Sequence, residues 1–81
     1  MTIYVEFVAA LRDRMGSDPY AYDGAARRIA DIMTDIGQRE GALDELTAPS
    51  LRFIHNDTIV DAQTELPDNA RFAACPPFTG G

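Results

Sequence analysis

One amphipathic helix is encoded by the sequence DGAARRIADIMTDIGQREG, residues 23–41. Its apolar side chains recur at steps of three and four residues, which places them on one face of a helix. These side chains are Ala25, Ala26, Ile29, Ile32, Met33 and Ile36. We therefore expect this to be the main helix of the domain, with its apolar face packed against a sheet.

The ends and the polar face of this helix have candidate interactions of their own. Asp23 is a candidate N-cap, because its carboxylate can accept hydrogen bonds from the free amides of the first turn. Arg27 and Asp31 are four residues apart, a spacing that allows a weak ion pair. We expect Gly41 to end the helix, with Gly37 as the alternative.

Five short segments have the composition of β-strands. In the first of them Ile3, Val5 and Phe7 alternate with other residues, which predicts one buried face. The segments are residues 2–8, 20–22, 50–56, 58–60 and 71–75. We expect the second to run antiparallel to the first. In the last, Phe72 and Ala74 share one face.

Turns and short helical segments separate these strands. Asn56 and Asp57 predict a tight hairpin turn, and residues 66–69 predict another turn in which Asn69 has positive φ. Residues 9–14 and 42–46 each predict a short helical turn. This order of elements is typical of a small α+β fold in which a sheet packs on one helix. The expected core comprises Ile3, Val5, Phe7, Ile29, Ile32, Met33, Ile36 and Phe72.

Size, charge and cysteine content narrow the class of protein. We expect one domain in the 81 residues, formed by residues 1–75 and followed by an extended tail, residues 76–81. Thirteen acidic residues against seven arginines, with no lysine, argue against nucleic-acid binding. We expect no membrane span and no secretory signal, because the sequence lacks a long apolar run and a basic start. A lone Cys75 fits a reducing compartment, so the expected location is cytoplasmic.

The sequence offers little catalytic chemistry. His55 is the only histidine, which excludes a site with two imidazoles. The acidic residues lack the spacing of a metal loop, and phosphate-loop and dinucleotide signatures are missing. Cys75 could be a nucleophile or a sulfur relay, but its apolar setting favours a structural residue. We therefore expect no catalytic residue and no metal site.

The last six residues carry the strongest functional signal. They are Pro76, Pro77, Phe78, Thr79, Gly80 and Gly81. The two prolines end the strand ladder and favour an extended chain, which loses less entropy when it enters a groove. The glycines fit a narrow channel and leave the terminal carbonyl open to a reagent, as formation of an acyl-adenylate requires. Phe78 is a candidate partner contact; alternatively, it folds back onto its own sheet.

The chain resembles, over essentially its full length, the sulfur-carrier (small) subunit of molybdopterin synthase, a ubiquitin-like β-grasp family. Residues 76–81 are similar to the family's proline-proline-x-serine/threonine-glycine-glycine ending, which is the most discriminating feature. Residues 3–12 resemble its first strand and helical turn, and Asn56 begins the hairpin where the family has a valine-asparagine step. Residues 66–69 resemble its leucine-x-aspartate-glycine turn, with Asn69 in the place of glycine.

The sequence also departs from this family near its last strand. Ala74 and Cys75 stand where a pair of phenylalanines is common, and Ala70 and Arg71 replace two acidic residues. Smaller side chains at these positions could alter the interface with a larger partner. The resemblance nevertheless implies a β-grasp fold, with a mixed sheet of four to five strands packed on one main helix.

The resemblance implies a mechanism centred on Gly81. A ubiquitin-activating-like adenylyltransferase would use ATP to adenylate the Gly81 carboxylate, and a sulfur donor would then convert it to a thiocarboxylate. Thr79 and Gly80 would enter the large subunit of molybdopterin synthase with the tail, in a heterotetramer, and residues 76–78 would contact that subunit. The sulfur would pass to cyclic pyranopterin monophosphate and form the dithiolene of molybdopterin. The chain would bind no cofactor and would be a non-catalytic subunit.

Three other functions remain open. A sulfur carrier of the same fold could serve thiamine, cysteine or another thio-metabolite, although such tails generally lack the proline-proline-x-threonine context. A ubiquitin-like protein modifier would also end in Gly-Gly. The last alternative is a plain interaction domain with a frayed end.

Overall fold

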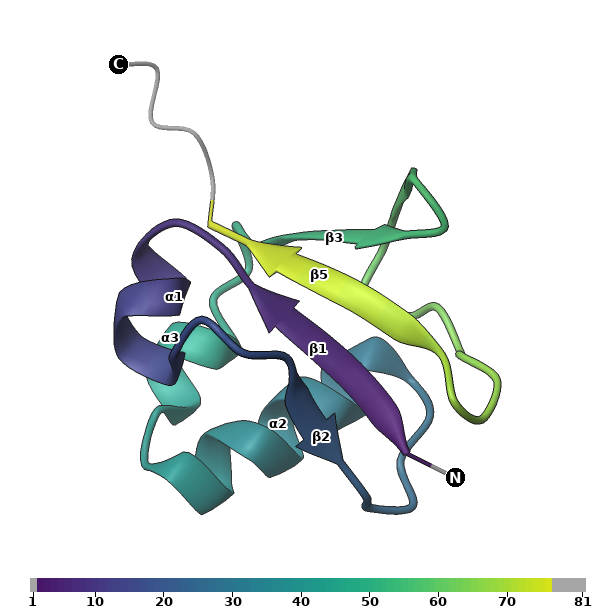
Figure 1. The fold of residues 1–81 in the computed structure, drawn as a ribbon, viewed down its shortest axis with the longest axis horizontal. Helices are drawn as coiled ribbons and strands as arrows, with labels where there is room; N and C mark the ends of the chain where they lie inside the picture. The colour runs from purple at the N-terminus through teal and green to yellow at the C-terminus, as the bar shows by residue number, and fades with distance from the viewer. Residues whose placement is uncertain (1, 77–81) are drawn as a thin grey trace.

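The computed structural model describes residues 2–76. These residues form five strands and three helices (Figure 1). In chain order these elements are β1 (Ile3–Phe7), α1 (Ala10–Met15), β2 (Tyr20–Tyr22), α2 (Ile29–Glu40), α3 (Leu43–Leu46), β3 (Arg52–His55), β4 (Thr58–Val60) and β5 (Arg71–Cys75).

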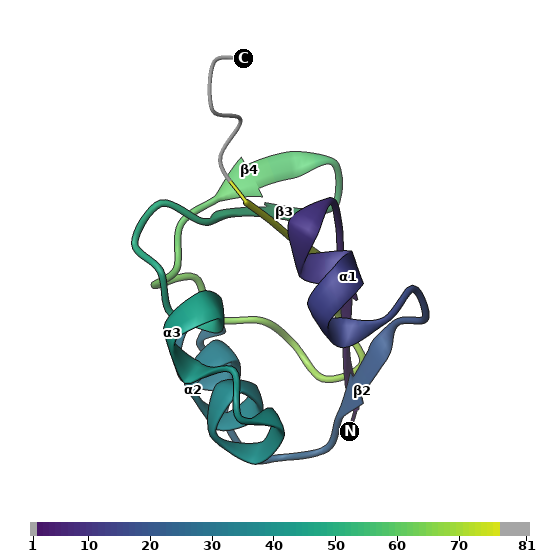
Figure 2. The same ribbon diagram turned by 90° about the vertical axis from the view of Figure 1, so that its left-hand side faces the viewer.

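The strands form one mixed sheet in the order β2-β1-β5-β3-β4. The pairing of β1 with β5 is parallel, and the other three pairings are antiparallel. Figure 1 shows α2 crossing behind the sheet. In Figure 2, α2 and α3 lie on one side and β1 and β2 on the other, with β3 and β4 above them. The predicted α+β sheet packed on one main helix is confirmed, and so is the antiparallel pairing of β2 with β1.

The core lies between α2 and the inner face of the sheet. All eight residues predicted for the core are buried in one apolar cluster. The cluster also includes residues from β2, α3, β3 and the loops, among them Tyr22, Leu46, Leu51, Phe53 and Leu66. Side chains that alternate along β1 and β5 therefore meet the apolar stripe of α2, as the sequence pattern predicts.

The start of α2 corrects the predicted N-cap. The helix begins at Ile29 with Arg28 at the cap position, so Asp23 does not cap it. The backbone just before the helix instead pairs with a distant segment: the Leu66 amide donates to the Arg27 carbonyl at 2.8 Å, and an isolated bridge joins Arg28 to Glu65. The backbone of Arg28 is extended, with φ −81° and ψ 135°, so the part of the helical pattern that precedes Ile29 does not form a helix.

The ion pair predicted between Arg27 and Asp31 is also wrong. Arg27 lies outside α2, and its Nε donates to Oδ1 of Asp68 at 2.7 Å. The hydrogen bond and the charge of this guanidinium hold the pKa of the Asp68 carboxyl below its usual value. Arg27 therefore links the segment before α2 to the turn before β5 through this ion pair.

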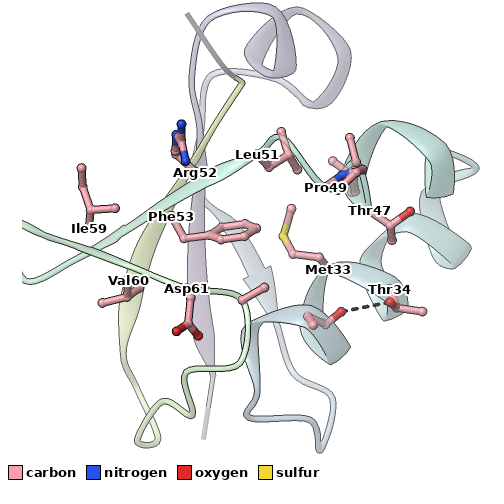
Figure 3. Close-up of a pocket in the computed structure, with 14 residues that line it drawn as sticks. Met33, Thr34, Thr47, Pro49, Leu51, Arg52, Phe53, Ile59, Val60 and Asp61 are labelled. Atoms are coloured by element: carbon pink, nitrogen blue, oxygen red, sulfur yellow. Dashed lines mark hydrogen bonds between the residues drawn. The ribbon is translucent and has the colours of Figure 1, made fainter.

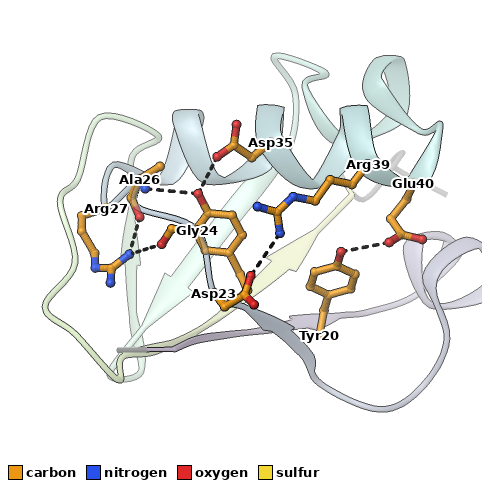
Figure 4. A network of polar contacts seen from close by, with 9 residues as sticks. Tyr20, Asp23, Gly24, Ala26, Arg27, Asp35, Arg39 and Glu40 are labelled. Carbon is orange, nitrogen blue, oxygen red and sulfur yellow. Dashed lines mark hydrogen bonds and ion pairs between the residues drawn. The ribbon is translucent and has the colours of Figure 1, made fainter.

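A polar network joins β2 and the following loop to α2 (Figure 4). The buried Tyr22 hydroxyl donates to Asp35 and accepts the Ala26 amide hydrogen at 3.1 Å. Arg39 lies over the Tyr22 ring at 5.3 Å from its centre and pairs with Asp23 at 3.4 Å. Asp23 thus contacts the last turn of α2 rather than its first turn.

The turn residues have the conformations predicted from the sequence. Gly41 ends α2 in the left-handed region with φ 67°, and Gly37 is a buried residue within the helix. Asn56 and Asp57 have φ of 52° and 62° at the hairpin between β3 and β4. Asn69 has φ 67°, which confirms its predicted positive value. No helix within residues 2–76 is long and apolar enough to cross a membrane.

Candidate functional site

The candidate site begins where β5 ends. This strand lies in the middle of the sheet, paired with β1 on one side and with β3 on the other. The ladder to β1 extends one residue beyond that strand, because the Val8 amide donates to the Ala74 carbonyl at 3.3 Å. The strand that precedes residues 76–81 is therefore paired with a neighbouring strand on each side up to its last residues.

Two side chains of β5 anchor this strand in the core. Phe72 is 2% exposed, and its ring meets that of Phe53 edge-on at 6.1 Å between centres. Ala74 is fully buried and is the register partner of Phe7 in β1 and of Phe53 in β3. Because burial of an aromatic side chain stabilises by several kcal/mol, β5 is a firm base for the residues that follow.

The predicted site residues lie at and beyond the end of this strand. Pro76 is half-buried and follows β5 directly, as expected for a residue that ends a ladder. Pro77, Phe78, Thr79, Gly80 and Gly81 lie outside the described residues. Their predicted roles therefore stay predictions, and so does the alternative that Phe78 folds back.

The last residue of β5 faces away from the core. Cys75 is half-buried and is the register partner of Arg52 on β3. Burial raises the pKa of the Cys75 thiol, which disfavours the thiolate needed for nucleophilic or sulfur-relay chemistry. Arg52 is exposed and forms no ion pair within residues 2–76. The geometry favours a structural Cys75, in agreement with the sequence.

Arg71 contacts two side chains of β1 on the outer face of the sheet. Its guanidinium lies over the Tyr4 ring at 5.8 Å from the centre and reaches a carboxylate oxygen of Glu6 at 4.0 Å. Its carbonyl lies 3.1 Å from Nδ1 of His55, so that ring nitrogen is the donor. His55 is thus an ordinary strand side chain, as predicted. Nowhere in the described part of the chain do three His, Cys, Asp or Glu side chains meet as a metal site.

The sequence did not reveal an apolar groove on the helix side of the sheet (Figure 3). The groove has a volume of about 610 Å³ and runs between β3–β4 and the segment that links α3 to β3. Its lining includes Met33, Phe53 and Pro49, with Ile59 and Val60 along one side. Ile59 is 72% exposed. The turn at Asn56 and Asp57 predicted that strand as a hairpin partner, but the exposure of its side chains depends on which neighbours cover the strand.

Comparison with known proteins agrees with this architecture. No family model and no curated protein matches the chain. The chain is similar to the crystal structure of SAMP1 from Haloferax volcanii, with a TM-score of 0.80 and 16% identity over 100% of both chains. It is also similar to the solution structure of the HVO 2177 protein of Haloferax volcanii, with a TM-score of 0.75 and 19% identity over 100% of this chain and 87% of that one. The chain therefore has a ubiquitin-like β-grasp fold, which confirms the predicted fold class.

Proposed function

We propose that this protein is a sulfur carrier that bears a thiocarboxylate on Gly81 and donates the sulfur to the dithiolene of molybdopterin. The observation that carries the proposal is the junction of a central, core-anchored β5 with the ending Pro-Pro-Phe-Thr-Gly-Gly, residues 76–81. A rigid β5 followed by a peptide that ends in two glycines is suited to positioning a reactive group in another protein's active site.

The chemistry requires a free Gly81 carboxylate. A carboxylate oxygen attacks the α-phosphorus of ATP on a ubiquitin-activating-like adenylyltransferase, and pyrophosphate leaves. Hydrosulfide or an equivalent donor then attacks the acyl carbon, and AMP leaves with the carboxylate oxygen that was phosphorylated. This forms a carbon–sulfur bond at Gly81, and neither the acyl carbon nor the sulfur changes its oxidation state.

Delivery takes place on a second protein. The tail enters the large subunit of molybdopterin synthase, where the thiocarboxylate sulfur attacks a carbon of the pterin precursor and displaces the oxygen substituent on that carbon, which leaves with a proton. Water then cleaves the bond between the acyl carbon and sulfur, which restores the carboxylate. In this scheme the chain is a non-catalytic subunit, and the groups that activate ATP and the precursor belong to its partners.

Two properties of the described residues support Gly81 rather than a side chain as the sulfur acceptor. Cys75, the only cysteine, has a thiol whose pKa is raised by burial, so it is a poor sulfur relay. His55 already uses Nδ1 on the Arg71 carbonyl, and it is the only histidine. The Gly-Gly ending is the remaining feature with evident chemistry.

The β-grasp fold by itself serves sulfur carriers and ubiquitin-like modifiers alike, so the tail separates these functions. A carrier for thiamine or cysteine needs only Gly-Gly, whereas Pro76, Pro77 and Phe78 add stiffness and an aromatic anchor. Those features favour the synthase small subunit, because a stiff tail loses less entropy when it inserts into a partner.

The test begins with activation. The protein is incubated with a cognate adenylyltransferase, ATP and a sulfide source, and its intact mass is measured. We expect a gain equal to the difference between sulfur and oxygen, located at Gly81 by peptide analysis. Deletion of Gly81 should abolish the gain, whereas Cys75→Ser should leave it unchanged. A sulfur adduct on Cys75 would overturn the mechanism.

The second step separates the synthase from other pathways. Binding to the large subunit is measured by titration calorimetry, and sulfur transfer from the thiocarboxylate form to the pterin precursor follows. Phe78→Ala should weaken this binding by about tenfold or more without unfolding the domain. Binding to a thiazole-forming or cysteine-forming enzyme instead would assign the chain to another sulfur pathway, and conjugates on lysines of other proteins would identify a modifier.

A further inference from the structure

The two edges of the sheet differ in how they are protected. At one edge, β2 begins directly after Pro19, which cannot donate a ladder hydrogen bond, and ends before Asp23, which is paired with Arg39. At the other edge, β4 comprises Thr58–Val60 and has no proline beside it, and its flanking residues are Asp57 and Asp61. Within residues 2–76 no further strand pairs with β4, so its outward backbone groups have no ladder partner.

The side chains of β4 add apolar surface to this open edge. Ile59 is 72% exposed and pairs in register with Ile54, whereas Val60 pairs with Phe53, which lines the groove. Figure 3 shows Ile59 standing apart from the cluster formed by Phe53 and Met33. A strand added beside β4 would therefore place one side chain along Ile59 and the next one over the groove.

The charges at the two ends of β4 indicate which strand could be added. Asp57 precedes β4 and Asp61 follows it; both are exposed, and neither forms an ion pair among the described residues. If a second copy paired antiparallel through Ile59, Asp57 of each copy would lie opposite Asp61 of the other. Like charges placed opposite each other are destabilising, so the acids disfavour self-association. The same two acids would attract a strand with a cation at each end.

We propose that the β4 edge binds an extended segment of a partner protein in which alternating apolar residues are bracketed by arginine or lysine. The partner backbone completes the ladder on β4, its central apolar residue covers Ile59, and a neighbouring residue enters the groove. Its two cations meet Asp57 and Asp61. The proposed contacts use none of residues 76–81, so the inference does not depend on the proposed sulfur chemistry.

The experiment uses the full chain and an acetylated, amidated peptide, Arg-Val-Ile-Val-Arg. Backbone amide shifts of the ¹⁵N-labelled protein are followed by NMR as the peptide is added. We expect saturable shifts at β4 and along the groove, including Ala48 and Ala62, with β2 unchanged. The matched peptide Glu-Val-Ile-Val-Glu should bind at least about threefold more weakly at low salt, and this difference should shrink as salt is added.

Three variants connect the shifts to the proposed contacts. Ile59→Lys removes an exposed apolar side chain and should weaken binding about tenfold with the fold intact by circular dichroism. The double variant Asp57→Asn, Asp61→Asn should remove the preference for the arginine peptide, and asparagine tolerates the positive φ at position 57. Asp18→Asn, in the loop before β2, is the matched control and should bind like the parent.

Several results would overturn the proposal. Equal binding of the two peptides, shifts at β2 rather than β4, or no binding at all would each do so. Concentration-dependent shifts at β4 without peptide, together with a dimer in sedimentation, would show that a second copy occupies the edge. Loss of binding in Asp18→Asn as well would show that the peptide responds only to the net negative charge of the chain.

Discussion

Gly37 is predicted to be intolerant of alanine even though it lies inside a helix. A Cβ built at this position would lie 2.8 Å from Cα and 3.3 Å from the backbone nitrogen of Leu43, the first residue of α3. These atoms belong to the backbone, so a change of rotamer cannot relieve the contact. Only a shift of α3 away from α2 would make room, and that shift would loosen the core around Leu46.

Two opposing terms decide the sign of the effect. Alanine in place of glycine favours a helix interior by about 1 kcal/mol. Overpacking against fixed neighbours costs about 1–3 kcal/mol, and contacts below 3 Å with backbone lie toward the upper part of that range. We therefore expect Gly37→Ala to lower the free energy of unfolding by about 1–2 kcal/mol. For a domain of this size, each kcal/mol lost lowers the Tm by about 4–8 °C.

Urea unfolding followed by circular dichroism measures this effect. The midpoint should fall by about 1 M, with the slope unchanged. Gln38→Ala, at an exposed position of the same helix, is the matched control and should stay within about 0.5 kcal/mol of the parent. Gly41→Ala provides a contrast, because its Cβ would meet nothing within 4 Å and its cost would come from φ 67° alone. A Gly37→Ala variant more stable than the parent would refute the close packing of α3 on α2.

The remaining predictions test other parts of the fold. Phe72→Ala should cost about 3–5 kcal/mol, because the ring is almost fully buried, and a thermal melt like that of the parent would contradict the position of β5. Tyr22→Phe should cost about 1–2 kcal/mol, because it removes the hydroxyl partner of Asp35 and leaves a backbone amide unpaired; an unchanged urea midpoint would contradict this. The pKa of Asp68 is lowered in the folded state by Arg27, so its contribution to stability is present above its unfolded pKa and is lost as the pH falls through the folded pKa. Arg27→Gln should therefore flatten the acid limb of a stability–pH profile, and an identical limb in parent and variant would show that this pair is not responsible.

Elements fixed by local sequence were predictable. The strands β1 and β5 alternate in a way that forces one face inward, and Asn56, Asp57 and Asn69 are residue types that tolerate the positive φ found there. The end of α2 at Gly41 follows from the same local property. In each case the signal and the residues it determines lie within a few positions of one another.

Features that depend on distant segments were not predictable from pattern alone. The helical pattern starts at residue 25, yet the helix starts at Ile29, because the Leu66 amide donates to the Arg27 carbonyl and the Ile29 amide donates to the Thr64 carbonyl. The same is true of Arg27, whose partner Asp68 lies 41 positions away. The groove and the exposed Ile59 likewise depend on which segments fail to cover β4.

The end of β5 shows how the structure changes the meaning of a sequence comparison. The resembling family commonly has two phenylalanines where this chain has Ala74 and Cys75, which suggested a smaller docking face. Successive residues of a strand point to opposite faces, however, and Ala74 is fully buried between its register partners Phe7 and Phe53. Phe7 and Phe53 lie on the two adjacent strands, and Phe72 lies two residues earlier on the same face of β5, so a further ring at this position would overpack the core. Of these two departures, only the one at Cys75 therefore alters the outer face, and it leaves a small side chain beside exposed Arg52 at the end of β5. Under the proposed function, a partner that receives residues 76–81 would meet this small side chain and the Arg52 guanidinium, which pairs with no acid within residues 2–76.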